Sequence, residues 1–195
     1  MPVKKIVVIG PESTGKSTLC QKLADHYKTL WVPEYAREYL ESNGTEYHYD
    51  DLLTIAKGQI NLEETISNKL FAISTSQPST INHQPSTINH QSSFLFIDTD
   101  MYVMKVWAEF VFNQCHNWIL DRIAERRYDL YLLCDIDLPW VEDPLREYPD
   151  QKIRAKLFHC YKDLLVNQTT SWCHIYGNYE DRFEKAISFI DQSIT

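Results

Sequence analysis

The chain has 195 residues, of which 44% are hydrophobic, and this suits one domain with an ordinary buried core. Its formal net charge of -8 argues against a partner such as nucleic acid that is held by general electrostatic attraction, because such binding needs a basic footprint. The first apolar run, at residues 6–10, is too short for a signal-peptide core or a membrane span. We therefore expect a cytoplasmic protein with no membrane partner.

The five cysteines are odd in number, and no two of them form a C-x-x-C pair. This pattern predicts reduced and mostly buried thiols, as is usual in the cytosol. The cysteines are Cys20, Cys115, Cys134, Cys160 and Cys173.

Short apolar runs alternate with longer stretches in which apolar residues recur at helical spacing. Strands are expected at residues 3–10, 29–33, 94–98, 128–135 and 172–177. Helical spacing is found at residues 52–66, 153–164 and 183–190, and a further helix pattern starts at Ser17. The alternation predicts a single α/β domain over residues 1–195, with a parallel sheet covered by helices on both faces.

A tandem repeat interrupts this pattern, because residues 78–84 and residues 85–91 both read PSTINHQ. The segment is polar and lacks the apolar seam of a coiled coil or the period of a solenoid. We interpret residues 74–93 as a low-complexity insertion in a disordered loop. The alternative, a metal pair formed by His83 and His90, is the less favoured interpretation.

The segment GPESTGKST, residues 10–18, matches the phosphate-loop pattern G-x-x-x-x-G-K-[ST]. It lies between a predicted strand and a predicted helix, which is the context that phosphate binding requires. Lys16 is expected to contact the outer phosphates of ATP, and the alternative is a turn with an exposed lysine. The expected nucleotide-binding residues are Gly10, Glu12, Ser13, Thr14, Gly15, Lys16, Ser17 and Thr18.

A magnesium site is expected where the third predicted strand ends. The run FLFIDTD places Asp98 directly after the apolar residues, with Asp100 two positions further on. Asp98 and the Ser17 hydroxyl are the predicted ligands of Mg²⁺. An exposed loop aspartate is the alternative interpretation of Asp98.

Missing motifs restrict the class of phosphate-loop protein. The chain has no N-K-x-D or T-K-x-D guanine motif, which argues against a GTPase. A motor or AAA-type ATPase is expected to carry the acidic pair DE at the end of the third strand, where this chain has DTD. These absences favour a kinase that phosphorylates a small acceptor.

The segment VPEYAREYL, residues 32–40, follows the second predicted strand and supplies a candidate acceptor pocket at the carboxyl edge of the sheet. Glu34 is expected to accept the proton of the acceptor hydroxyl, a role for which Asp100 is the alternative. Arg37 is expected to bind a phosphate or ribose oxygen. A Glu34–Arg37 salt bridge that only shapes the loop is the structural alternative.

Further candidate acceptor contacts come from an amide and from aromatic rings. Gln59 lies on an apolar helical stripe beside Gly58, so its amide needs either a ligand or backbone partners, and both interpretations stay open. The rings of Tyr35, Tyr102 and Trp107 are candidates to stack on a flat ligand, although each also fits a plain core position.

The segment after the fourth predicted strand, DLPWVEDPLREYPDQKIR, is rich in proline and charge and is a candidate lid. It carries Arg146 and Arg154. Arg146 is expected to stabilise the charge of the transferred phosphoryl group. A solvated loop with ordinary ion pairs is the alternative.

Together these segments resemble the ribosylnicotinamide kinase domain of NadR-type NAD-salvage proteins. The similarity rests on GPESTGKSTL, VPEYAREYL, AKGQ, FIDTD followed by Trp107, the segment RYDLYLLCDIDLPWVEDPLREYP and the closing IYGNYEDRFEKAI. It spans nearly the whole chain apart from the repeat. The resemblance implies ATP-dependent phosphorylation of nicotinamide riboside to nicotinamide mononucleotide, with Mg²⁺.

The resemblance also implies a five-stranded sheet of order 2-3-1-4-5, and it places Gly177 and Arg182 near the adenine. Because the first predicted strand begins at Val3, we expect the adenylyltransferase and DNA-binding segments of longer relatives to be absent. Two alternatives remain for the function: another nucleoside or deoxynucleoside kinase, and a regulatory ATP-binding module without a small-molecule acceptor. The oligomeric state is not indicated by the sequence.

Overall fold

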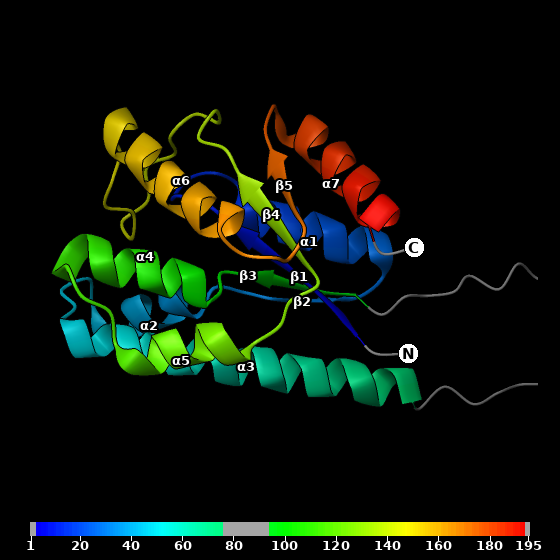
Figure 1. Ribbon diagram of the computed structural model, residues 1–195, viewed down its shortest axis with the longest axis horizontal. Helices are drawn as coiled ribbons and strands as arrows, with labels where there is room; N and C mark the ends of the chain where they lie inside the picture. The colour runs from blue at the N-terminus through cyan, green and yellow to red at the C-terminus, as the bar shows by residue number, and fades with distance from the viewer. Residues whose placement is uncertain (1–2, 76–93, 194–195) are drawn as a thin grey trace, which may run out of the picture.

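The computed structural model describes residues 3–75 and 94–193 of the chain (Figure 1). The tandem repeat and the two histidines proposed as an alternative metal pair lie outside the described residues. The predicted insertion begins two residues too early, because residues 74–75 still belong to a helix.

The five predicted strands form one parallel sheet. Its strands are β1 (Lys4–Ile9), β2 (Leu30–Val32), β3 (Phe94–Asp98), β4 (Leu130–Cys134) and β5 (Trp172–Ile175). The strand order is β2-β3-β1-β4-β5, which confirms the predicted topology. The three central strands are the most apolar and are buried on both faces, as parallel strands between helical layers require.

Seven helices connect the described strands and complete the fold. They are α1 (Lys16–Tyr27), α2 (Tyr35–Asn43), α3 (Tyr49–Thr75), α4 (Met101–Phe112), α5 (Asn117–Glu125), α6 (Gln151–Val166) and α7 (Tyr179–Ser193). Helical spacing in the sequence locates α1, α3, α6 and α7. It misses α4, since the sequence MYVMKVWAEFVF is apolar on nearly every side. The short helices α2 and α5 were not predicted either.

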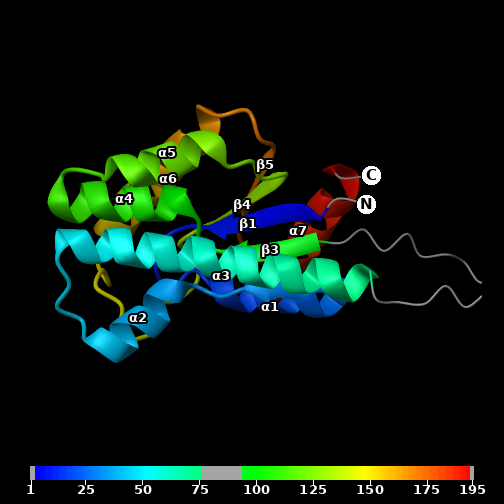
Figure 2. The ribbon, with the colours of Figure 1, turned by 90° about the horizontal axis from the view of Figure 1, so that it is seen from below.

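The helices form two layers around the sheet. Helices α1 and α7 pack on one face, in a core that includes Leu19, Leu23, Ala186 and Ile190. Helices α3, α4 and α6 pack on the other face. A third cluster joins α2, α3, α4 and α5 without the sheet, so α4 is buried between two apolar clusters (Figures 1 and 2). This double burial explains why α4 lacks an amphipathic pattern.

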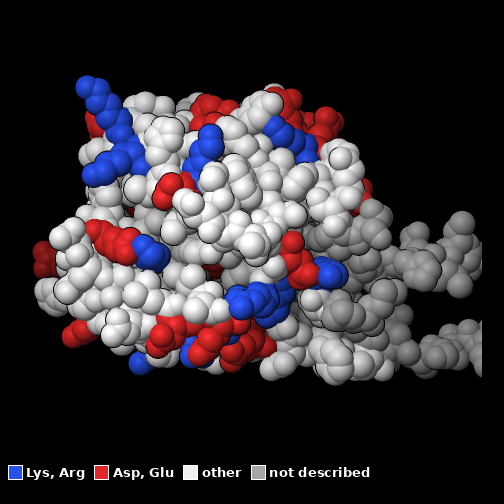
Figure 3. Space-filling model, viewed as in Figure 1, with Lys and Arg blue, Asp and Glu red and all other residues white. Residues whose placement is uncertain are grey.

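All neighbouring strands are parallel, so all five carboxyl ends lie at the same edge of the sheet. Loops from β1, β2, β3 and β4 therefore meet there. Charged side chains of both signs are interspersed on the face drawn in Figure 3. Within residues 3–75 and 94–193, none of the helices is both long and apolar enough to span a membrane.

Candidate active site

Two glycines give the phosphate loop its shape. Gly10 and Gly15 have φ angles of 146° and 76°, which L-residues with a side chain rarely adopt. A Cβ atom on Gly10 would lie 2.7 Å from the carbonyl oxygen of Cys134, so a side chain there is excluded by space as well. The loop therefore follows the predicted strand and enters α1 as the motif requires.

Side-chain donors hold the carbonyl groups of the loop. The four carbonyls of residues 11–14 each accept a hydrogen bond from a side chain. Lys16 Nζ donates to the first at 3.0 Å, Arg154 to the second and third at 3.4 and 3.3 Å, and Arg182 to the fourth at 2.8 Å. In a trans peptide, the following N–H points opposite to the carbonyl, so these bonds turn the loop amides toward the other side. Both arginines are only 2% exposed.

The loop lines a cavity of about 340 Å³ at the carboxyl edge of the sheet. The cavity brings together every predicted residue of the phosphate loop, together with Glu34, Arg37, Trp107 and Arg146. The remaining predicted residues do not line it: Tyr35, Gln59, Asp98, Asp100, Tyr102, Arg154, Gly177 and Arg182. The cavity is therefore built from segments that are distant in the sequence.

Asp98 and Ser17 lie together at the end of β3, as predicted. The Ser17 hydroxyl donates a hydrogen bond to Asp98 Oδ2, and the other carboxylate oxygen, Oδ1, is buried without a hydrogen-bond partner among the residues that the structure describes. Burial, and then the nearby charge of Glu34, raise the pKa of Asp98 to about 7. A buried carboxylate with a free oxygen beside a hydroxyl fits Mg²⁺, which uses one or two carboxylates together with substrate phosphates.

Glu34 and Asp100, the two candidate bases, have different environments. Glu34 precedes α2, lines the cavity and accepts a hydrogen bond from Thr99 Oγ1 at 3.2 Å. Asp100 caps α4 by accepting from the amides of Tyr102 and Val103, at 2.9 and 3.4 Å. Its second oxygen accepts from a buried tyrosine hydroxyl at 2.8 Å. The structure thus places Glu34 at the cavity and Asp100 away from it.

The amide of Gln59 is satisfied by backbone, which is the structural alternative that the sequence left open. Its oxygen accepts from the Tyr35 amide at 2.7 Å, and its nitrogen donates to the carbonyls of Pro33 and Asp98, both at 3.3 Å. The absence of a side chain at Gly58 makes room for the Tyr35 ring, which a Cβ would meet at 2.0 Å. The prediction that Gln59 and Tyr35 contact a ligand is therefore corrected. Gln59 bonds to the backbone of Pro33 and Tyr35, so it supports the segment that follows β2.

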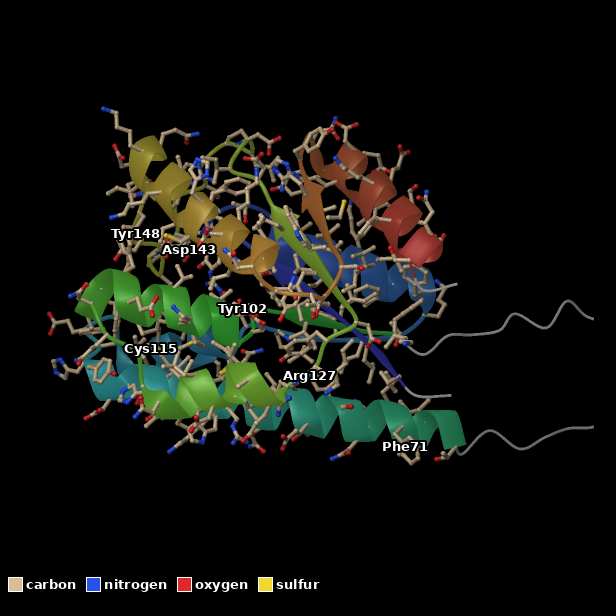
Figure 4. The ribbon with its side chains drawn as sticks, in the orientation of Figure 1. Phe71, Tyr102, Cys115, Arg127, Asp143 and Tyr148 are labelled. Carbon is tan, nitrogen blue, oxygen red and sulfur yellow. The ribbon has the colours of Figure 1, made fainter. Side chains whose placement is uncertain are left out.

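The lid, residues 135–150, is tied to the phosphate loop by polar contacts. Glu12 accepts from the amides of Glu147 and Tyr148 at 2.9 and 3.1 Å. Burial raises the pKa of Glu12. Arg146 donates to the Ser13 hydroxyl at 3.3 Å, which places this lid arginine beside the phosphate loop. Figure 4 labels Tyr148 on this segment.

The lid also contacts the acceptor side of the cavity. Arg37 forms an ion pair with Asp143 of the lid at 2.8 Å, and not with Glu34 as the structural alternative supposed. Trp107 Nε1 donates to the Tyr47 hydroxyl at 2.8 Å, and this hydroxyl donates to Glu147 at 2.9 Å. Tyr47 was missed by sequence reasoning, because it lies in a loop between helices where no pattern marks it.

Three predicted residues have a supporting place beside the cavity. Arg154 belongs to α6, so it is not part of the lid. It donates to carbonyl groups of the phosphate loop. Arg182 donates to the carbonyls of Gly177 and Asp135 at 2.8 and 3.1 Å and also to the carboxylate of Asp137. That Gly177 and Arg182 lie near the adenine stays a prediction.

A model of the family described as AAA domain matches residues 5–182. The NadR proteins of Salmonella typhimurium and Escherichia coli, both named trifunctional NAD biosynthesis/regulator protein, are each 26% identical to the chain over 97% and 96% of its length. The chain spans 42% of the length of each of these relatives. The resemblance to NadR-type proteins is thus confirmed.

Solved structures show the same fold. A NadR structure in complex with NR has a TM-score of 0.74 at 24% identity, over 98% of this chain and 50% of that one. Thymidylate kinase from Candida albicans has a TM-score of 0.62 at 16% identity, over 98% of this chain and 92% of that one. The fold is that of the P-loop kinases.

The family model carries the description AAA domain, and the fold that the chain shares with kinases agrees with the prediction of a kinase over a motor or AAA-type ATPase. Where an acidic pair would place its second carboxylate, Thr99 follows Asp98 and donates a hydrogen bond to Glu34.

Proposed function

The chain belongs to the AAA-domain family, and on that premise we propose that it transfers a phosphoryl group from ATP to nicotinamide riboside. The product of this reaction is nicotinamide mononucleotide. The observation that carries the proposal is the shared cavity, in which the phosphate loop faces Glu34 and Arg37 under a lid that bears Arg146. A protein that only sensed ATP would not need the acceptor side of this cavity.

Each side chain has a role in the proposed reaction. Lys16 and the loop amides bind the phosphates of ATP, while Ser17 and Asp98 are the residues that would hold Mg²⁺. When bound, Mg²⁺ supplies positive charge that offsets the charge of the phosphates. Arg146 stabilises the charge on the phosphoryl group as it is transferred.

Glu34 is the proposed general base. Its carboxylate takes the proton of the ribose 5′-hydroxyl as that oxygen forms a bond to the γ-phosphorus. The bond between the γ-phosphorus and its bridging oxygen breaks, and ADP leaves with the electron pair. Arg37, in its ion pair with Asp143, holds the acceptor segment against the lid during this step.

Two findings support the choice of acceptor. A NadR protein whose fold matches this chain was solved in complex with NR. The acceptor side also presents the rings of Tyr47 and Trp107, which meet edge to face with centroids 5.0 Å apart. The nicotinamide ring of the riboside carries a positive charge, and aromatic faces attract such a ring.

A panel of acceptors tests the proposal. The purified protein is incubated with Mg²⁺ and ATP together with nicotinamide riboside, purine and pyrimidine nucleosides, or thymidylate, and ADP formation is measured. We expect the highest kcat/KM with nicotinamide riboside. Turnover of a pyrimidine nucleoside or of thymidylate without turnover of nicotinamide riboside would reject this acceptor and favour the nucleoside or nucleotide kinase alternative, which the thymidylate kinase fold suggests.

A further inference from the structure

The seven arginines of the chain lie at two places. Four line or support the active-site cavity: Arg37, Arg146, Arg154 and Arg182. The other three line a second cavity and are Arg122, Arg126 and Arg127. Arginine is the residue that proteins use most often to recognise phosphate and carboxylate groups, because its planar head presents several donors in a fixed geometry. In a chain whose net charge is -8, three arginines at one cavity indicate a candidate site for an anion.

The second cavity measures about 300 Å³ and shares no lining residue with the active site. It lies between the amino end of α4, the carboxyl end of α5 and the turn at residues 168–170. Figure 4 labels Tyr102 and Arg127, which belong to its wall. In the same view, Figure 3 shows blue atoms of basic side chains gathered at the position of Arg127.

Two of the three arginines already have carboxylate partners. Arg126 pairs with Glu63 at 2.8 Å and with Glu64 at 2.6 Å. Arg122 pairs with Glu125 on its own helix at 2.5 Å. These pairs fix the positions of the two heads at the cavity wall and leave them less positive than free cations.

Arg127 and Arg122 have donor groups that are not used in ion pairs and are available to a ligand. Arg127 donates to the carbonyl oxygens of Ala124 and Arg126, at 2.6 and 3.0 Å, and forms no ion pair with a carboxylate among residues 3–75 and 94–193. Arg122 lines the cavity, and its side chain is 33% exposed, with Glu125 as its one carboxylate partner among residues 3–75 and 94–193. The exposed part of its head can donate charge-assisted hydrogen bonds to an anion in the cavity.

Apart from Met101 and Ile123, the rest of the wall carries polar groups and presents little negative charge to a ligand. Gln168, Thr169 and Thr170 contribute an amide and hydroxyl groups, and Tyr102 contributes a phenol ring. Asp100 also lines the cavity, but both of its oxygens accept hydrogen bonds from the protein. Such a wall suits the hydroxyl groups of a sugar better than an apolar body.

We propose that the second cavity binds a small phosphomonoester whose body carries hydroxyl groups, with Arg127 and Arg122 contacting the phosphate. One water molecule occupies about 30 Å³ in the liquid, so the cavity has the volume of about ten water molecules. A lone phosphate would therefore leave most of the cavity to water. This site does not depend on the proposed reaction, because it lies apart from the phosphate loop and from the acceptor side.

Calorimetry at low salt tests the site with three probes, which are inorganic phosphate, ribose 5-phosphate and ribose. The protein is first saturated with Mg²⁺ and a non-hydrolysable ATP analogue, so that the phosphate loop is occupied. We expect ribose 5-phosphate to bind more tightly than inorganic phosphate, and ribose to give no heat. Arg127→Gln should weaken the binding of ribose 5-phosphate by about tenfold, because a charge-assisted contact is lost while the exposed position keeps the fold intact.

Arg37→Gln is the matched control, because it removes an arginine from the acceptor side of the active site. We expect it to leave the binding of ribose 5-phosphate unchanged. Binding that is lost in Arg37→Gln and kept in Arg127→Gln would assign the ligand to the active site and overturn the proposal. Absence of heat with both phosphate probes would also overturn it, and equal affinity for the two would reject the hydroxylated body.

Discussion

The phosphate side and the acceptor side of the active site are built in different ways. On the phosphate side, one loop of nine residues supplies backbone amides, and buried donors such as Arg154 and Arg182 hold its carbonyls from behind. On the acceptor side, the groups come from α2, α4 and the lid, and they meet through side-chain contacts such as the Arg37–Asp143 pair. Arg37 is 46% exposed in that pair.

The difference concerns how strongly each side is fixed before a ligand arrives. Backbone amides in a supported loop are positioned in advance, so the phosphate side needs little rearrangement to bind. An exposed ion pair contributes little stability, so the contact between the lid and the acceptor segment can be lost at a small cost in free energy. Changes on the phosphate side should therefore have large effects and changes in the exposed contacts small ones.

The largest effect is expected from Lys16→Ala. The cation contacts the transferring phosphates, so its loss should lower kcat/KM by about 1000-fold. Lys22→Ala, which removes an exposed lysine from the same helix, is the control and should keep full activity. Steady-state kinetics with ATP and nicotinamide riboside measure both variants. Equal activity of the two would show that the loop lysine has no catalytic role.

Glu34→Gln should lower kcat by about 100-fold while ATP binding is kept, because the base is lost and the phosphate side is intact. Asp100→Asn is the matched comparison, since asparagine caps a helix as well as aspartate does and Asp100 lies outside the cavity. We expect the kcat of Asp100→Asn to stay within a few-fold of the wild-type value. The reverse order of the two effects would transfer the role of base to Asp100.

The dependence of Mg²⁺ binding on pH tests the metal site. Burial, and then the charge of Glu34, raise the pKa of Asp98 to about 7, so at lower pH the side chain carries a proton that Mg²⁺ must displace. Affinity for Mg²⁺ should fall by about tenfold per pH unit below this pKa and stay level above it. Titration of the nucleotide-loaded protein, corrected for Mg²⁺ binding to free ATP, measures this. An Asp98→Asn variant with the same pH dependence would contradict the assignment.

The smallest effect is expected for the lid contact on the acceptor side. Asp143→Asn removes the ion pair with Arg37 and should raise the KM for the acceptor by no more than about fivefold, as exposed pairs contribute about 1 kcal/mol at most. The change should shrink as salt is added. Glu41→Gln, which removes the other partner of Arg37, serves as the control. An effect as large as that of Glu34→Gln would mean that the pair takes part in the chemistry.

The same contrast explains what could be predicted from the sequence. The phosphate loop and Asp98 were found because their geometry is local: a strand, a fixed spacing of glycines and a helix start place them. The strands were found because the central sheet is buried on both faces and its strands are continuous apolar runs.

The remaining features depend on contacts between distant segments. Gln59 looked equally suited to a ligand and to backbone, and only the position of the loop around Pro33 decides between them. Tyr47 and the supporting role of Arg154 are set by where the lid and α6 lie. No periodicity in the sequence records such positions, as the all-apolar sequence of α4 also shows.

The proposed reaction requires that the phosphate side and the acceptor side act on the same phosphoryl group. Phosphorus NMR of the wild-type protein with Mg²⁺, ATP and nicotinamide riboside follows the fate of that group. We expect a new phosphomonoester signal that grows in step with ADP and is absent without the riboside. Release of inorganic phosphate alone, at the same rate with and without the riboside, would contradict it.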